Sequence, residues 1–239
     1  MHRFWRFRRV LPLLLAGLVI TGDGHGQPAG GYAPVAPPPA LVAALRSQFN
    51  VVRDWINERD YASAGPAVVC LKPLTDLAAV QSDHADWTAG INQLRMNQEA
   101  LGDAVRKKDA AAAAKAIAAA NTTLDGMAKT PAPEKRTVAN FKFPGGSVKT
   151  WMSLLDGAYI DAKSAKTAPD LELLAGALAE EGNALAHMRP DARWKADSLA
   201  MRDTALKTVE LARSGDLEAA RKTLKGVYAS CESCHNRKK

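Results

Sequence analysis

From Ala40 onward, apolar residues recur every three or four positions, and this spacing is typical of amphipathic helices. Alanine, leucine, lysine and glutamate, which favour helices, dominate these stretches. Aromatic residues make up only 6% of the chain, and alternating strand-like patterns are scarce. The sequence therefore predicts an all-α protein.

Two stretches rich in proline and glycine interrupt the helical pattern. Residues 27–40 include Pro37-Pro38-Pro39, and we predict that they form a flexible leader. Residues 128–146 contain three prolines and two adjacent glycines, which predict a linker. These breaks leave one helical segment at 41–127 and another at 147–239.

The two helical segments resemble each other. Val52–Trp55 matches Val148–Trp151 at its first and last residues, and Ala85–Trp87 matches Ala192–Trp194 in the same way. From the second pair, an ungapped offset of 107 residues carries Arg106 onto Arg213, Asp109 onto Asp216 and Lys115 onto Lys222. Several matches at one offset predict an internal duplication.

Each segment divides into four helical pieces with short connections. In the second segment these run from Val148 to about Lys166, from a cap at Asp170 to His187, from Asp191 to Arg213, and from a cap at Asp216 to the C-terminus. In the first segment, Pro66 and Pro73 predict a shortened second helix. Short connections favour an up-down-up-down arrangement, so we predict two tandem four-helix bundles.

The N-terminus has the pattern of a secretory signal peptide at residues 1–26. Four arginines between Arg3 and Arg9 precede the apolar run Val10–Ile20, which is too short to span a bilayer as a helix. We therefore expect an exported, periplasmic protein with no membrane anchor after cleavage. Removal of this segment takes away four arginines and Asp23, and lowers the net charge from +7 to +4, with 28 basic and 24 acidic residues. This modest, dispersed charge gives no indication of nucleic-acid binding.

The C-terminal sequence Cys231-Glu-Ser-Cys234-His235 is a c-type haem attachment motif. On a helix, spacings of three and four residues place all three side chains on one face. Two thiols there can add to the two vinyl groups of one haem, while the imidazole of His235 ligates the iron. A thioredoxin-like pair needs a βαβ context, and structural zinc needs four ligands, so both alternatives are weaker. The remaining cysteine, Cys70, has the pattern of a small buried helix residue.

A four-helix segment that ends in this motif resembles the class II c-type cytochromes, the cytochrome c-prime and c-556 group. The resemblance covers about residues 145–239. It implies a single covalent haem c and a protein that exchanges electrons with redox partner proteins rather than an enzyme. Members of this family often dimerise, so it also implies a homodimer. The chain ends four residues after His235 and lacks the usual aromatic residue there, which is a departure from the family pattern.

The first segment lacks the attachment residues. At the 107-residue offset, Cys231, Cys234 and His235 correspond to Leu124, Met127 and Ala128. We therefore predict that residues 41–127 form a degenerate repeat without haem and that the chain carries one haem.

The family resemblance implies two functional types that differ at the sixth position of the iron. Met152 lies near the start of its helix, at the pole where the fourth helix ends, and is the first candidate ligand; His187 is the alternative. The first segment has Ile56 and Val80 at the matching positions. Trp151 and Trp194 are expected to pack the bundle, and the resemblance implies propionate contacts from Arg193 and Arg237.

Three functional hypotheses follow. The leading one is a periplasmic monohaem cytochrome that transfers one electron at a time. The second is a five-coordinate haem protein that binds small gases such as NO or CO. The third is a haem-bearing docking module of a respiratory assembly, in which the haemless segment binds the partner.

Overall fold

The computed structural model describes residues 32–129, 137–138 and 141–236. Regular structure in these residues is α-helical, as predicted, apart from an isolated antiparallel β-bridge between Tyr32 and Val138. The helices are α1 (Pro38–Asn57), α2 (Tyr61–Val69), α3 (Leu71–Ala79), α4 (Ala85–Lys107), α5 (Ala110–Met127), α6 (Val148–Ser164), α7 (Ala168–Leu185), α8 (Ala192–Arg213) and α9 (Leu217–Asn236). Within the described ranges, no helix is long and apolar enough to cross a membrane. The predicted signal peptide lies outside these ranges.

Polar side chains define where most of these helices begin. The residue before the helix accepts a hydrogen bond from a backbone N–H of the first turn at Asp60, Asp109, Ser147, Thr167, Asp191 and Asp216. The prediction that Asp170 caps α7 is wrong, because Thr167 is the cap and the Asp170 N–H donates to its hydroxyl at 3.2 Å. Pro169 fits in the first turn of α7 because the N–H it lacks has no helical partner there.

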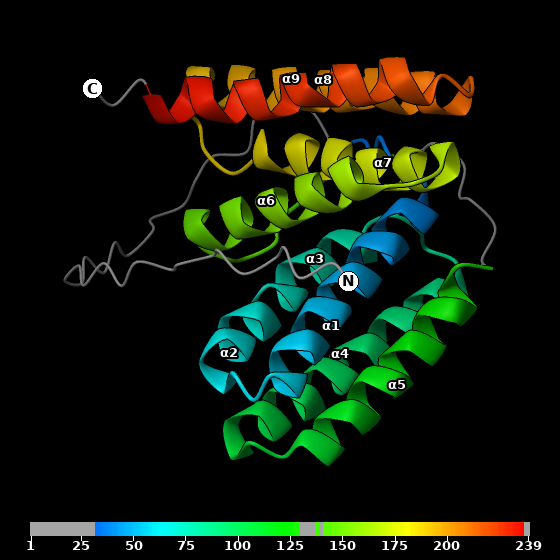
Figure 1. The fold of residues 1–239 in the computed structure, drawn as a ribbon, viewed down its shortest axis with the longest axis vertical. Coiled ribbons are helices and arrows are strands. Elements are labelled where there is room, and N and C mark those ends of the chain that lie inside the picture. Colours follow the sequence, from blue (N-terminus) through cyan, green and yellow to red (C-terminus); the bar gives the residue numbers. More distant parts are fainter. Residues whose placement is uncertain (1–31, 130–136, 139–140, 237–239) are drawn as a thin grey trace, which may run out of the picture.

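Helices α6 to α9 form the second half of the molecule and alternate in direction (Figure 1). Contacts between α7 and α8 and between α8 and α9 are extensive, whereas α6 makes limited contact with α9. Helices α7 and α8 approach closely at Gly182, where an added Cβ would lie 3.1 Å from Met201 Cε. The N-terminal end of α6 and the C-terminal end of α9 lie at the same end of the molecule.

Helices α1 to α5 form the first half. Its predicted second helix is present as two short helices, α2 and α3, which meet at Cys70. Pro66 lies within α2, and Pro73 lies in the first turn of α3, where it needs no helical hydrogen-bond partner. Helix α1 packs against α2, α3 and α5, and α4 packs along α5.

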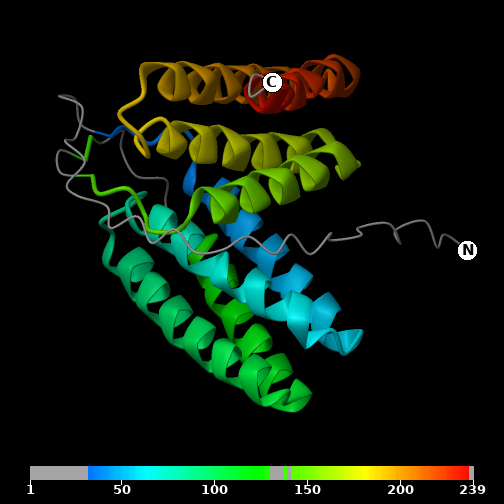
Figure 2. The ribbon, with the colours of Figure 1, turned by 90° about the vertical axis from the view of Figure 1, so that its left-hand side faces the viewer.

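Helix α7 is the part of the second half that packs on the first half, with α1 on one side and α8 on another (Figures 1 and 2). The chain leading into α1 also packs on it. Glu180 of α7 accepts hydrogen bonds from the Tyr32 hydroxyl and from the backbone N–H groups of Val35 (2.7 Å) and Ala36 (2.8 Å). The segment from Tyr32 to Pro39, predicted to belong to a flexible leader, is therefore anchored, and α1 already begins at Pro38.

Candidate functional site

The attachment motif lies in the last turns of α9. Cys231, Cys234 and His235 all fall within this helix, so their three- and four-residue spacings give them a common face. Cys231 is half-buried and packs against the hydrophobic core. The side chains of Cys234 and His235 lie outside the described part of the structure, as does Arg237.

Two cavities, of about 310 and 50 Å³, lie beside Cys231. Both are lined by Met152, Leu155, Met201 and Cys231, so side chains from α6, α8 and α9 enclose them together. Helix α7 adds Leu178 to the larger cavity and Leu185 to the smaller one. We call this combined space the Cys231 cavity.

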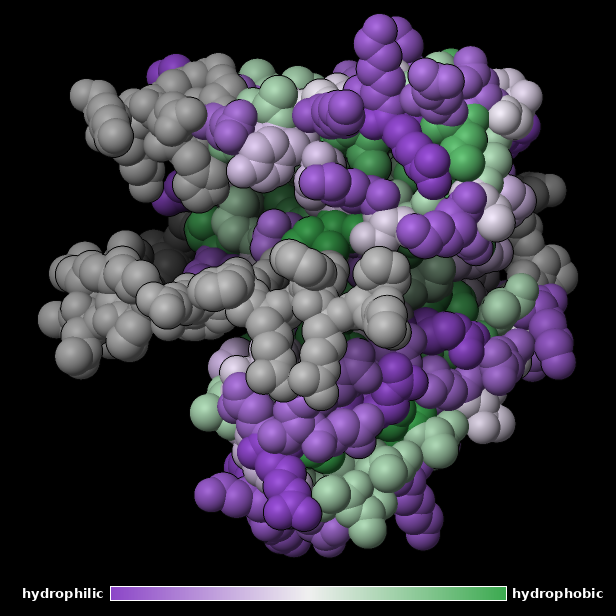
Figure 3. Space-filling view, in the orientation of Figure 1, coloured by the Kyte–Doolittle hydropathy of each residue, from purple (hydrophilic) through white to green (hydrophobic). Residues whose placement is uncertain are grey.

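The Cys231 cavity lies where α6 and α9 make little direct contact. Its walls are mainly apolar, although Asp156, Asp197 and Glu232 are among the lining residues. On the face drawn in Figure 3, many hydrophilic side chains lie over the α8–α9 layer, and hydrophobic side chains are visible in the band beneath it. A mainly apolar pocket of this size, with a few polar groups, is typical of a cofactor site.

The two candidates for the sixth iron position have different surroundings. Met152 is half-buried and lines both parts of the Cys231 cavity. His187 follows the end of α7, and its ring packs edge-on against Tyr32 and Phe141, with centroid distances of 5.4 and 5.6 Å. Burial, and then the charge of Lys195, lower the pKa of His187. His187 is not among the lining residues of either cavity.

In the first half, buried apolar side chains occupy the positions that correspond to the attachment cysteines. Leu124, which corresponds to Cys231, is fully buried, and Met127, which corresponds to Cys234, is 3% exposed. Met127 lies over Gly90, where an added Cβ would be 2.5 Å from its Cγ. At the 107-residue offset, Gly90 corresponds to Asp197, which lines the Cys231 cavity. The Met127 side chain therefore fills the space in the first half that corresponds to the Cys231 cavity in the second half.

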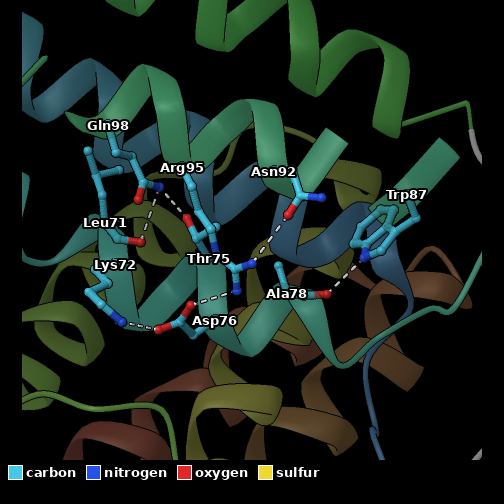
Figure 4. A network of polar contacts seen from close by, with 9 residues as sticks. All are labelled: Leu71, Lys72, Thr75, Asp76, Ala78, Trp87, Asn92, Arg95 and Gln98. Atoms are coloured by element: carbon cyan, nitrogen blue, oxygen red, sulfur yellow. Dashed lines mark hydrogen bonds and ion pairs between the residues drawn. The ribbon is translucent and has the colours of Figure 1, made fainter. Parts of the chain in front are cut away.

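The two halves share several local structures at the same offset. The Trp87 indole N–H donates to the Ala78 carbonyl at 2.9 Å (Figure 4), and the Trp194 indole donates to the Leu185 carbonyl at 2.7 Å. The helix pairs α4 and α8, and α5 and α9, begin 107 residues apart. Before the last helix of each half, Lys108 and Gly215 both have positive φ, and Asp109 and Asp216 both cap the helix.

Several side chains at the cavity were not predicted. Tyr159 of α6 and Tyr228 of α9 stack with centroids 5.6 Å apart, and both line the larger cavity. Tyr159 lies seven residues after Met152, which is two helical turns, and Tyr228 lies one turn before Cys231. These helical spacings from Met152 and Cys231 were the sequence signal that could have identified both tyrosines.

The two tryptophans that were predicted to pack the bundle do so. Trp151 is fully buried in the core, and Trp194 packs against the core and lines the smaller cavity, with the Arg189 guanidinium 5.2 Å from its ring centroid.

Compared with known protein families, with curated protein sequences and with solved structures, the chain shows no match. Functional assignment therefore depends on the motif and on the geometry around it.

Proposed function

We propose that this protein is a periplasmic c-type cytochrome with one haem, which carries single electrons between redox partner proteins. The observation that carries the proposal is the mainly apolar Cys231 cavity, lined by all four helices of the half that bears the attachment motif. Haem is a flat and largely apolar group, and it fits a cavity with such walls. The predicted signal peptide agrees with attachment outside the cytoplasm.

In this proposal the thiols of Cys231 and Cys234 hold the haem through two thioether links. His235, one residue further along α9, would ligate the iron. The bound haem supplies the one-electron iron couple. Leu155, Leu178 and Leu185 exclude water from the haem and lower the local dielectric constant, which tunes the potential.

We propose Met152 rather than His187 as the sixth ligand. Met152 lines the cavity, whereas the His187 ring packs against Tyr32 and Phe141. Methionine together with histidine as iron ligands would raise the reduction potential, which favours an electron carrier.

We also propose that the two halves are tandem four-helix units derived from one duplicated segment, of which residues 147–239 keep the haem. The matched indole–carbonyl bonds and the shared left-handed residues at one offset support this duplication. In the degenerate copy, Leu124 and Met127 occupy the positions that correspond to the attachment cysteines.

The visible spectrum of the reduced holoprotein tests the assignment. Six-coordinate iron with Met152 predicts a low-spin spectrum with separate α and β bands that does not change with CO. A high-spin spectrum that shifts on addition of CO would instead indicate a five-coordinate gas-binding protein, and Met152 would then not be a ligand. The matched controls are His187→Ala, which leaves a Met152-ligated spectrum unchanged, and Met152→Ala, which converts it to the CO-sensitive form.

A further inference from the structure

Helix α7 carries a second buried glutamate, Glu181, which the proposed electron transfer does not use. Its side chain is 1% exposed, and its Oε2 atom has no hydrogen-bond partner within the described residues. The adjacent Glu180 differs, because three donors from the Tyr32–Ala36 segment and the Gln81 amide (3.0 Å) satisfy it. Glu181 is thus an interior acid with one carboxyl oxygen that has no hydrogen-bond partner in the described part of the chain.

The surroundings of Glu181 favour its neutral form. Burial, and then the negative charge of Asp161 on α6, raise its pKa to about 8. Asp161 itself accepts a hydrogen bond from the Ser47 hydroxyl of α1.

Two other ionisable groups lie on neighbouring elements. Cys70, between α2 and α3, is also buried, and its thiol pKa is raised by burial and by Glu181. On α8, the Arg202 guanidinium is paired with Asp203 and bonded to the Asn183 amide oxygen.

Glu181 lies close to the Cys231 cavity. Leu178 and Leu185, three residues before and four residues after it, both line that cavity. Residues with these spacings occupy one helix face and have Cβ atoms about 5–6 Å apart. Glu181 is therefore about one helical turn from both cavity-lining leucines of α7.

The first half has no counterpart to this acid. At the 107-residue offset, Glu181 corresponds to Leu74, which is buried in the core of the first half. A leucine is the ordinary residue for such a position, so the glutamate is not required for packing. At this pair of positions, only the half with the attachment motif has an ionisable side chain. Among the described residues, no three histidine, cysteine or acidic side chains are grouped to hold a metal ion, so we consider a proton as the ligand.

We propose that Glu181 is a redox-linked proton site, which releases its proton when the protein is oxidised and regains it on reduction. This inference rests on the proposed function. In the oxidation step, one electron leaves for the partner protein and one proton leaves the Glu181 carboxyl for solvent, so the net charge inside the protein is unchanged. The carboxylate compensates the positive charge that oxidation adds to the cofactor, and each event promotes the other.

Coulomb's law gives the scale of such a coupling. At an effective dielectric constant of about 20, one unit of charge about 10 Å from a carboxyl group would change its proton affinity by roughly tenfold. The midpoint potential of the holoprotein should therefore fall with rising pH in an interval around pH 8 and level off on either side.

Potentiometric titration of the holoprotein over this pH range tests the inference. Glu181→Gln, a neutral isostere of the protonated acid, should remove the pH-dependent interval. Glu181→Leu, which copies the first half, should do the same. Asp161→Asn should move the interval to lower pH, because it removes the nearby negative charge. The matched control Glu172→Gln, on the same helix and paired with Arg213 at the surface, should leave the interval in place.

A second readout does not depend on the potential. The oxidised-minus-reduced infrared spectrum should contain the loss of a protonated-carboxyl band in the unmodified protein, and Glu181→Gln should lack that loss. A haem-bearing protein whose potential has the same pH dependence with and without Glu181 would overturn this inference alone. A purified protein without a Soret band would instead refute the proposed function, and this inference with it.

Discussion

The first and second halves of this protein place the same local structures around different interiors. Both have an indole bonded to the carbonyl nine residues earlier, and a left-handed residue before the last helix. Where the first half packs Leu124 and Met127, the second half leaves a cavity beside Cys231. The comparison shows that two bundles with the same local framework can differ in whether the space beside the last helix is filled, and that a few side chains make this difference.

The largest expected effect comes from the attachment cysteines. Cys231→Ala combined with Cys234→Ala should abolish covalent haem, which denaturing gels stained for haem peroxidase activity would detect. The matched change in the first half, Leu124→Ala, should keep the haem and lower the free energy of unfolding by about 2–5 kcal/mol, because it opens a cavity in a filled core. Loss of haem from the Leu124→Ala variant would contradict the proposal that only the second half binds haem.

The next comparison concerns the first helix of each half. Met152→Ala should convert a low-spin spectrum into a high-spin, CO-sensitive one with a lower reduction potential. Ile56→Ala, at the matching and buried position of α1, should lower stability by about 2–5 kcal/mol without a spectral change. Equal spectra for the two variants would show that Met152 is not an iron ligand.

Glu181 and its counterpart Leu74 predict a pH dependence of stability. The pKa of Glu181 is raised from an ordinary value of 4.5 to about 8, so the unfolded chain releases this proton at lower pH than the folded protein does. The contribution of Glu181 is therefore fully present below about pH 4.5 and is lost as the pH rises toward 8, by on the order of 1 kcal/mol per pH unit. Denaturant unfolding at several pH values should record this loss.

Glu181→Leu should flatten that part of the stability profile. Helical circular dichroism confirms that the variant has folded before the comparison is made. A profile that keeps the same slope without Glu181 would mean that other groups control the pH dependence.

The smallest expected effect lies at the turn before the last helix of each half. Lys108 has φ 56° and Gly215 has φ 86°, a conformation that favours glycine. Lys108→Gly should therefore raise stability by about 0.5–1 kcal/mol, and Gly215→Ala should lower it by about 1 kcal/mol. Thermal unfolding of the two single variants measures both, and effects of equal sign would contradict the structural match.

The helices themselves were largely predictable from the sequence. The helix start at Asp191 and the cap at Asp216 follow from local signals, and the structure has Asp191 and Asp216 as the caps of α8 and α9. The cap of α7 was misassigned because Thr167 and Asp170 are both good capping residues, and Pro169 between them is compatible with the first turn of a helix.

Features that depend on contacts between distant segments were not predictable. The sequence Glu180-Glu181 is typical of a solvated helix face, yet both side chains are buried because α7 is covered on several sides. The anchoring of Tyr32 by Glu180 joins residues 148 positions apart. The Cys231 cavity likewise depends on the distance between α6 and α9, and a local sequence pattern does not determine that distance.

In the proposed function, the second half alone binds haem covalently, and it binds one. The most direct test is the intact mass of the protein, produced in cells that attach c-type haem, together with its absorption spectrum. We predict the mass of the processed polypeptide plus one haem, with a Soret band that survives denaturation. A mass equal to that of the bare polypeptide, without a Soret band, would contradict the claim.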